Sequence, residues 1–416
     1  MQTNLADFIK DTPEGKEADA ILRSCVHCGF CTATCPTYQL LGDELDGPRG
    51  RIYLIKGVLE GAPATPKTQL HLDRCLTCRS CETTCPSGVK YGRLIDIGRA
   101  VVERQVGRPM GQRLLRAAIT ETLPRRWLFT PLLRTGQALR RVLPAALRAK
   151  VPLAQGDAAP AAVARHARTM LVLQGCVQPA MAPAINAAAT RVFDALGVSL
   201  LAAPKAGCCG ALRHHLNEQE RALDDMRRNI DAWWSYIEQG AEAIVMTASG
   251  CGVMVKDYGH LLAHDSAYAA KAARVTQLTR DLSEILPDFA DALSARLGGG
   301  KRERVAYHPP CTLQHGQQIR GKVEQLLKLA GVDASLCADS HLCCGSAGTY
   351  SILQPELSTQ LRDNKLAALK ATGATSIVSA NIGCQSHLQS GTDLPVRHWV
   401  ELIDEALGAD AGARHA

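Results

Sequence analysis

Two stretches decide the N-terminal fold: Cys25-x2-Cys28-x2-Cys31-x3-Cys35-Pro36 and Cys75-x2-Cys78-x2-Cys81-x3-Cys85-Pro86. In each stretch, three cysteines separated by two residues can present three sulfurs to one inorganic core, as a cubane 4Fe–4S cluster requires. A single Cys-x2-Cys pair is weak evidence, because zinc sites and redox dithiols share it. Two complete sets at this spacing are strong evidence. The sequence therefore predicts two 4Fe–4S clusters, with structural zinc as the alternative.

The spacing resembles that of bacterial two-cluster ferredoxins, in which the fourth cysteine of each run binds the cluster of the other run. The resemblance implies crossed ligand sets. One cluster is then held by Cys25, Cys28, Cys31 and Cys85, and the other by Cys75, Cys78, Cys81 and Cys35. His27 lies between two of these cysteines. We expect it to tune the cluster potential or simply to pack, because four sulfurs already satisfy a cube.

The composition is that of a globular protein with reduced thiols. The chain has 416 residues, of which 46% are hydrophobic and 21% charged, so we expect two or three domains. Its 17 cysteines are odd in number, and the first 20 residues contain no apolar export signal. The longest uncharged stretch, residues 170–190, is interrupted by glutamine, glycine and proline, so it does not predict a membrane span. We therefore expect a cytoplasmic location.

The net charge of +7 is confined to one segment. Residues 108–150 contain ten Arg or Lys and one acid, Glu121, so this segment carries +9 and the rest of the chain −2. Because no excess exists outside it, we expect no nucleic-acid partner. We interpret residues 108–167 as a basic connector that prolines divide into short pieces, with a flexible part at Ala154–Ala164. These prolines are Pro124, Pro131, Pro144 and Pro152.

From about residue 168 the chain repeats itself. The first half contains Cys176, Cys208, Cys209 and Cys251, and the second Cys311, Cys343, Cys344 and Cys384. The lone first cysteines are 135 residues apart, and so are the Cys-Cys-Gly motifs. An internal duplication explains this spacing, with its boundary near residues 297–301. Each half is patterned as strand, helix, strand, helix, strand, which predicts a parallel sheet with the cysteines at the carboxyl ends of its strands.

The sequence thus predicts an α+β multidomain protein. An N-terminal α-helical two-cluster ferredoxin domain (1–107) and the basic connector (108–167) precede two duplicated α/β cysteine-rich domains with parallel sheets (168–299 and 300–416). We interpret the eight duplicated cysteines as candidate ligands of additional cluster or redox sites, with burial as small apolar residues as the alternative. For Cys337, which has no counterpart in the first half, we expect packing.

Charged and polar residues near the cysteines have two interpretations. Arg49 and Arg51 can stabilise cluster charge or lie at a solvated helix start. For His308, His315 and His341, which lie close to the second set of duplicated cysteines, we expect ordinary polar roles. The alternative is a supporting or proton-handling role at a quinone site.

The tandem arrays resemble the cysteine-rich domains of heterodisulfide reductase and its relatives. With the ferredoxin motifs, the layout is most similar to the glycolate oxidase iron–sulfur subunit family. The stretches that carry this resemblance are residues 25–45, 229–234, 340–350 and 396–399. One departure is clear. Ala248 and Asn381 stand where heterodisulfide-type arrays carry a fifth cysteine, so the non-cubane clusters of those arrays do not transfer intact.

The resemblance implies electron transfer in a complex that oxidises glycolate to glyoxylate, from FAD on partner subunits toward a quinone-type acceptor. No Gly-x-Gly-x-x-Gly fingerprint is present, and oxidising a 2-hydroxy acid by hydride transfer needs a flavin or nicotinamide, so we expect that step on a partner. The alternatives are the equivalent subunit of an L-lactate or anaerobic glycerol-3-phosphate dehydrogenase, and a metal-stabilised scaffold.

The basic connector has the composition of a surface-binding segment. It mixes leucines, Trp127 and Phe129 with arginines at roughly helical spacing. Such a segment can lie on anionic lipid with its apolar groups in the interface. We expect peripheral contact with the cytoplasmic face of the inner membrane, with docking against partner subunits or a free linker as the alternatives.

Overall fold

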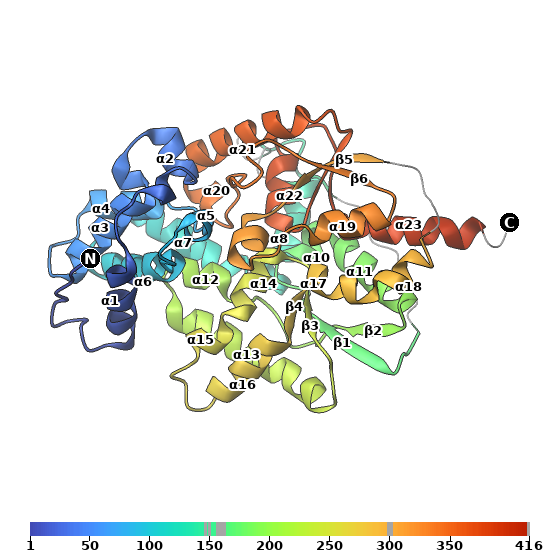
Figure 1. The fold of residues 1–416 in the computed structure, drawn as a ribbon, viewed down its shortest axis with the longest axis horizontal. Coiled ribbons are helices and arrows are strands. Elements are labelled where there is room, and N and C mark those ends of the chain that lie inside the picture. The colour runs from blue at the N-terminus through green and yellow to red at the C-terminus, as the bar shows by residue number, and fades with distance from the viewer. Residues whose placement is uncertain (145–147, 149–150, 155–163, 298–302, 414–416) are drawn as a thin grey trace.

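A computed structural model of the chain describes residues 1–144, 148, 151–154, 164–297 and 303–413. The N-terminal helices lie at one side of two sheet-containing halves (Figure 1). Most of the predicted flexible segment, residues 155–163, lies outside the described residues. So does the predicted boundary at 299/300.

The N-terminal part is helical, as predicted. Its helices are α1 (Pro13–Ser24), η1 (Phe30–Thr32), α2 (Pro36–Leu41), η2 (Glu44–Asp46), α3 (Pro48–Leu59), α4 (Pro66–Asp73), α5 (Ser80–Thr84) and α6 (Tyr91–Gln105). Pro36, which closes the first cysteine run, is the first residue of α2, where its fixed φ suits a helix start. The core forms where α1, α3 and α6 bring together buried Leu22, Ile55 and Leu94.

The connector is more ordered than its prolines predict. It forms two 13-residue helices, α7 (Met110–Thr122) and α8 (Arg126–Ala138). Pro124 separates them, but Pro131 lies inside α8, which contradicts the expected break there. Proline costs one helical hydrogen bond, and the carbonyl it leaves unpaired belongs to Trp127, whose side chain is 74% exposed. Water at this surface can solvate that carbonyl.

Both duplicated halves contain a parallel sheet, as predicted. The first consists of β1 (Arg168–Val172), β2 (Val198–Leu201), β3 (Ile244–Met246) and β4 (Thr279–Asp281). The second consists of β5 (Arg304–His308), β6 (Asp333–Leu336), β7 (Ser376–Ser379) and β8 (Val396–His398). The strand orders, β2-β1-β3-β4 and β6-β5-β7-β8, are equivalent. The sequence pattern missed β4 and β8, because strands of three residues show no periodicity.

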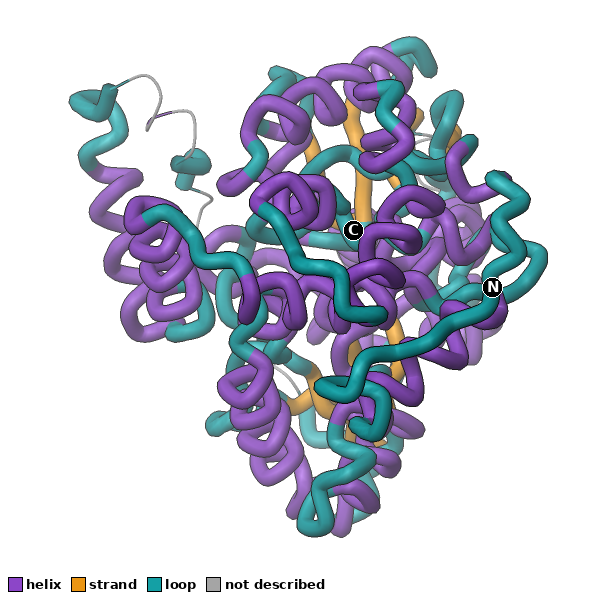
Figure 2. Tube along the Cα trace, turned by 90° about the vertical axis from the view of Figure 1, so that its left-hand side faces the viewer, coloured by secondary structure: helices purple, strands orange, loops and turns teal. Residues whose placement is uncertain are grey.

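Helices cover both faces of each sheet, and the strands run through the interior (Figure 2). In the first half these helices are α10 (Gln178–Met181), α11 (Pro183–Ala195), α12 (Ala211–His215), α13 (Gln219–Glu238), α14 (Ser249–Lys256), α15 (Tyr258–Leu261), α16 (Ala269–Leu278), α17 (Leu282–Ile285), η3 (Leu286–Phe289) and α18 (Ala290–Ser294). In the second half they are η4 (Thr312–Gly316), α19 (Lys322–Leu329), α20 (Tyr350–Leu353), α21 (Pro355–Lys370), α22 (Ile382–Gln389) and α23 (Trp399–Ala413).

The two halves share one hydrophobic core. Alternate residues of β1 and β5, among them Val172 and Tyr307, face this core together with Phe193 of α11 and Trp399 of α23. Helices α11 and α23 pack against each other across the junction. The duplicated halves therefore form a single body in which the carboxyl ends of both sheets keep a fixed relation.

Candidate metal centres

The two ferredoxin loops share left-handed residues at equivalent positions. His27 and Gly29 in the first loop, and Thr77 and Arg79 in the second, all have φ between 54° and 83°. These left-handed residues turn the chain sharply between successive cysteines, which lets the sulfurs face one point. The ring of His27 packs edge-on against Tyr53, with 4.7 Å between centroids. A packing role for His27 is thus visible.

The first group of cysteines surrounds a pocket near the surface. Cys25, Cys28, Cys31 and Cys85 line it together with Cys81 and with apolar side chains such as Ile52 and Val89. Burial, together with repulsion from the nearby sulfurs of Cys25 and Cys85, raises the pKa of Cys31 to about 11. Thiolates held this close need a compensating cation. Cys85, from the second run, therefore lies with the cysteines of the first run.

The second group lies deeper. Burial raises the pKa of Cys81 well above its usual range, and repulsion from Cys78, Cys75 and Cys35 adds to the rise. Cys35, from the first run, thus lies with the cysteines of the second run. This grouping is the one that crossed ligand sets require, although the assignment of each sulfur to a cluster stays a prediction. All eight cysteines are free thiols, a donor set that fits two 4Fe–4S clusters.

Arg51 supplies positive charge beside the second group, whereas Arg49 lines the pocket of the first group. Arg51 is 1% exposed, so the solvated-start interpretation is wrong for it. Its Nη1 donates to Thr37 Oγ1 at 3.1 Å, and that hydroxyl lies 3.3 Å from Cys35 Sγ. Burial opposes its charge, but Tyr91, Cys75 and Cys35 outweigh burial and raise the pKa of Arg51. Arg49 is partly exposed and pairs with Glu44.

The four cysteines of the first duplicated half also meet. Cys208 hydrogen-bonds Cys176 and Cys209, and these contacts hold the pKa of Cys208 well below its usual range. Cys251, near the start of α14, hydrogen-bonds Cys209. The backbone carbonyl of Cys208 accepts from Asn229 Nδ2 at 2.7 Å, which fixes the Cys-Cys turn. We call these four residues the first array.

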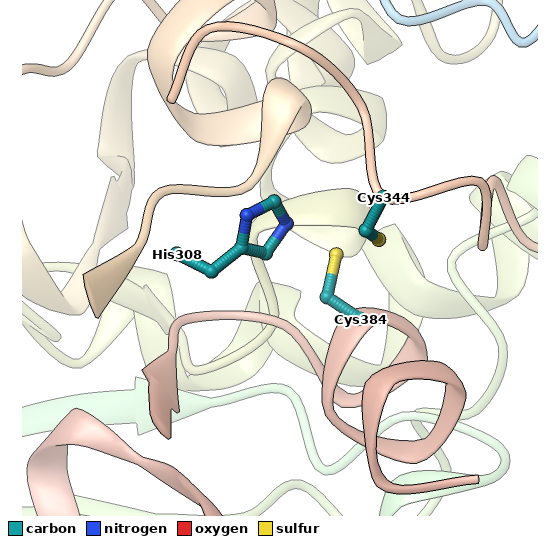
Figure 3. Close-up of side chains that lie close together, drawn as sticks. All are labelled: His308, Cys344 and Cys384. Carbon is teal, nitrogen blue, oxygen red and sulfur yellow. The ribbon is translucent and has the colours of Figure 1, made fainter. Parts of the chain in front are cut away.

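Cys311, Cys343, Cys344 and Cys384 form the equivalent second array. The sulfurs of Cys311 and Cys343 are 3.8 Å apart. His308 joins this array, because a ring nitrogen lies within 4.8 Å of the sulfurs of Cys344 and Cys384 (Figure 3). Cys337 packs in the same apolar cluster as Cys344 and Cys384, but its sulfur lies 4.0 Å from Lys365 Nζ and it is not among the donors that converge with His308, which supports a packing role.

The second array adjoins the second ferredoxin group. Cys78 packs into one small cluster with Cys311 and Cys343. Burial raises the pKa of Cys78 well above its usual range, and the next contribution comes from Cys311. The two groups of sulfurs are therefore neighbours, although 233 residues separate Cys78 from Cys311 in the chain.

His315 joins the two parts at this point. Its Nε2 lies 2.8 Å from the backbone carbonyl oxygen of His341 and must donate to it, so Nδ1 accepts from the hydroxyl of Thr83 at 2.9 Å. Burial lowers the pKa of His315 to about 4, so the ring is neutral at pH 7. This is the ordinary polar role that the sequence predicts for His315.

Asn381 connects the two arrays. Its Oδ1 accepts from the backbone N–H of Gly250, next to Cys251, at 3.4 Å. Its Nδ2 donates to Cys384 Sγ at 3.6 Å. Sequence reasoning noted Asn381 only as a missing cysteine. The pairing of the two halves was not visible in the pattern, so this contact was missed.

Comparison with known proteins agrees with the geometry. A family model described as 4Fe-4S dicluster domain matches residues 21–89, and one described as Cysteine-rich domain matches 170–256 and 305–389. The chain is 55% identical over 408 residues to the glycolate oxidase iron-sulfur subunit of Escherichia coli (strain K12), which covers 98% of this chain and 99% of that protein. The chain belongs to the glycolate oxidase iron–sulfur subunit family. The resemblance drawn from the motifs is confirmed.

Two further relatives place the chain within a wider group. A probable glycolate oxidase iron-sulfur subunit of Bacillus subtilis (strain 168) is 31% identical and covers 93% of this chain and 94% of its own. Lactate utilization protein A of Exiguobacterium sp. is 25% identical over 56% of this chain and 95% of its own length. The matched domains support iron–sulfur clusters in the ferredoxin part and in the cysteine-rich halves. Each matched range falls inside one predicted domain, whose outer boundaries stay predictions.

None of the helices in the described residues is both long enough and apolar enough to cross a membrane.

Proposed function

We propose that this chain is the electron-transfer subunit of a glycolate-oxidising complex, carrying electrons from flavin on partner subunits toward a quinone-type acceptor. Iron–sulfur clusters, when bound, accept and release single electrons. The observation that carries the proposal is the contact between Cys78 and the second array. It places the second ferredoxin group next to the cysteine-rich halves.

The surroundings of the sulfurs suit this function. Cys28 is exposed, whereas Cys81, Cys311 and Cys384 are buried. The first ferredoxin group therefore lies at the surface, where a partner can approach, and the later groups are shielded from water. Arg51 compensates the negative charge of the second group. We propose that flavin-bearing subunits dock near Cys28 and that the cysteine-rich halves lie on the acceptor side.

We further propose that α7 and α8 rest on the cytoplasmic face of the inner membrane. Large apolar side chains on these helices are exposed, including Leu114 at 64% and Trp127 at 74%. Arg113 directly precedes Leu114 in the chain, and Arg126 directly precedes Trp127. Apolar groups that insert beside cationic groups that contact phosphates are the pattern of an interfacial helix.

Sedimentation with vesicles tests this contact. Wild-type protein should bind vesicles that contain phosphatidylglycerol, and binding should fall at least tenfold in Leu114→Ser/Trp127→Ser. The control is Tyr53→Ser, which removes an exposed aromatic group from the ferredoxin part. If the double variant binds like wild type, the membrane proposal is wrong. If it leaves vesicle binding intact but releases partner subunits, α7 and α8 form a docking surface instead.

Serine at Cys78 tests the electron-transfer proposal. In the purified complex, Cys78→Ser should slow glycolate-driven reduction of a quinone analogue at least tenfold, while glycolate still bleaches the flavin. The matched control is Cys337→Ser, a buried cysteine outside both arrays. A scaffold role predicts the opposite: bound zinc, little colour, and loss of flavin bleaching whenever the complex falls apart. Comparing glycolate, L-lactate and glycerol 3-phosphate as reductants distinguishes the alternative substrates.

A further inference from the structure

The two arrays differ by one donor. Each has four cysteines, but the second also has His308, three residues before Cys311. The equivalent position of the first half, three residues before Cys176, is Leu173. Leu173 is 4% exposed and packs in an apolar cluster. At this position the two halves share the fold but differ in the side chain, hydrocarbon in the first and imidazole in the second.

His308 is buried without hydrogen-bond partners. It is 1% exposed, and neither ring nitrogen has a partner among the described residues. Buried polar groups are almost always satisfied, so such a ring needs an explanation. Its backbone is held in place as the last residue of β5, and its carbonyl accepts from Ser379 Oγ at 2.9 Å. The ring is therefore fixed in position with a free lone pair.

That ring faces sulfur. It is directed toward Cys344, on the loop after β6, and Cys384, near the start of α22 (Figure 3). Its nitrogen and the two sulfurs all lie within 4.8 Å of one another. Neutral imidazole and thiolate are both good ligands of iron and zinc.

We propose that His308 binds the iron–sulfur centre of the second array through a ring nitrogen, beside Cys344 and Cys384. The first array, with Leu173, then has sulfur ligands only. Because His308 supplies a neutral ligand, the centre of the second array needs one thiolate fewer than the four cysteines provide. With imidazole in that place the centre is less negative, which favours its reduced state, as histidine ligands do in Rieske centres. The second array is thus the more oxidising of the two. The ligand assignment stands by itself; only the position of this centre on the electron-transfer path rests on the proposed function.

Two other groups were candidates: an ion-paired cluster around Asp96, and His398, whose Nε2 also has no partner among the described residues but which faces no set of thiols. Asp96 forms ion pairs with His214 and His215 where the ferredoxin part meets the first half, so these groups satisfy one another. His398 is buried like His308, but its Nδ1 accepts from the backbone N–H of Val400 and its ring stacks on Trp399. His308 alone among these faces a set of thiols.

Nitrogen hyperfine coupling tests the proposal directly. Full-length protein is purified anaerobically with 15N only in histidine and reduced, and electron–nuclear double resonance is recorded. Wild type should contain more iron than the eight atoms of two cubes, and one paramagnetic centre should show a 15N coupling. His308→Leu, which copies the residue of the first half, should lose that coupling. The control, His341→Leu, removes a nearby half-buried histidine and should keep it.

His308→Leu also distinguishes a role of His308 as a ligand from a role as a buried side chain that only fills space. Leu occupies the equivalent position of the first half, so the fold should accept His308→Leu. If His308 only fills space, this variant keeps its iron content and every spectroscopic signal. His308→Cys restores a donor and should retain the centre with a lower reduction potential.

Several results overturn the proposal. They are a wild-type iron content of only eight, zinc in the second array, absence of a 15N coupling in wild type, and a coupling that persists in His308→Leu. The proposed function can survive each of them, because its own test is the loss of quinone reduction in Cys78→Ser.

Discussion

Removing the buried charge of Arg51 should lower the reduction potential of the second ferredoxin cluster. In Arg51→Met, Asp46 keeps Arg74 at 2.8 Å and His71 at 3.1 Å as partners, so no isolated buried carboxylate is created. The loss of one positive charge near the sulfurs is therefore the main change. Without it, the extra electron of the reduced cluster is less stable.

The structure sets the size of this effect. Thr37 Oγ1 lies 3.1 Å from Arg51 Nη1 and 3.3 Å from Cys35 Sγ. The guanidinium is thus about 6 Å or less from a cluster ligand. At an effective dielectric constant of about 20, unit charges about 6 Å apart interact by about 2.8 kcal/mol. For a one-electron couple, with 59 mV per tenfold change, this corresponds to about 120 mV. Because the electron spreads over the cluster, we expect a shift of about 100 mV.

The assay is a redox titration followed by electron paramagnetic resonance. Arg51→Lys keeps the charge and should retain most of the potential, while Arg49→Met removes a partly exposed charge that solvent screens and should leave the second cluster almost unchanged. Iron content must match wild type for the comparison to hold. A wild-type potential in fully loaded Arg51→Met would refute the electrostatic reasoning.

Three further predictions concern packing, pH and the junction between the parts. Gly50→Ala should destabilise the protein by more than about 2 kcal/mol and lower its iron content, because the added Cβ would lie 2.1 Å from the carbonyl oxygen of Glu44. The control, Gly57→Ala in the same helix, has room for a Cβ and should stabilise the protein by about 0.5 kcal/mol. Equal effects of the two variants in denaturant unfolding would contradict this reasoning. Burial raises the pKa of Asp281 from 3.8 to about 6. Ionising this carboxylate therefore lowers the stability of the folded protein increasingly from about pH 4 to pH 6, and the full loss is present above pH 6. The stability of Asp281→Asn relative to wild type should therefore be about 3 kcal/mol greater at pH 8 than at pH 4, and a difference that does not change with pH would contradict this. Asp257→Asn weakens the ion pair with Arg79 (3.1 Å) and should speed proteolysis between the ferredoxin part and the halves, whereas the exposed Asp224→Asn should not.

The cysteine spacing predicted much of the fold. The ferredoxin motifs require tight turns between successive cysteines, and the duplicated motifs each follow a strand of a parallel sheet. In each half the three cysteine motifs follow the first three strands of the sheet, as the sequence pattern predicts. The shared core was not predictable. Val172 and Tyr307 are both ordinary strand residues, and their neighbouring residues in the sequence do not indicate that they face the same core.

The candidate site was predictable as a set of ligands but not as an arrangement. Spacing selected sixteen cysteines as candidate ligands, whereas the residues around them depend on long-range contacts. Arg51 appeared at a solvated helix start, yet it is enclosed by Thr37, Asp46 and His71. The contact of Cys78 with Cys311 joins two motifs that no sequence periodicity relates. His308 was considered with its neighbours, but its burial and free nitrogens exist only in three dimensions.

Rapid freeze-quench spectroscopy of the complete complex tests the central claim most directly. Glycolate is mixed with the oxidised complex and a quinone analogue, and reduced iron–sulfur signals are followed from milliseconds onward. The account predicts that these signals appear at least as fast as the quinone analogue is reduced. In Cys78→Ser, quinone reduction should slow at least tenfold, while the signal of the first ferredoxin cluster still appears. Quinone reduction at full rate while the iron–sulfur signals stay absent would contradict it.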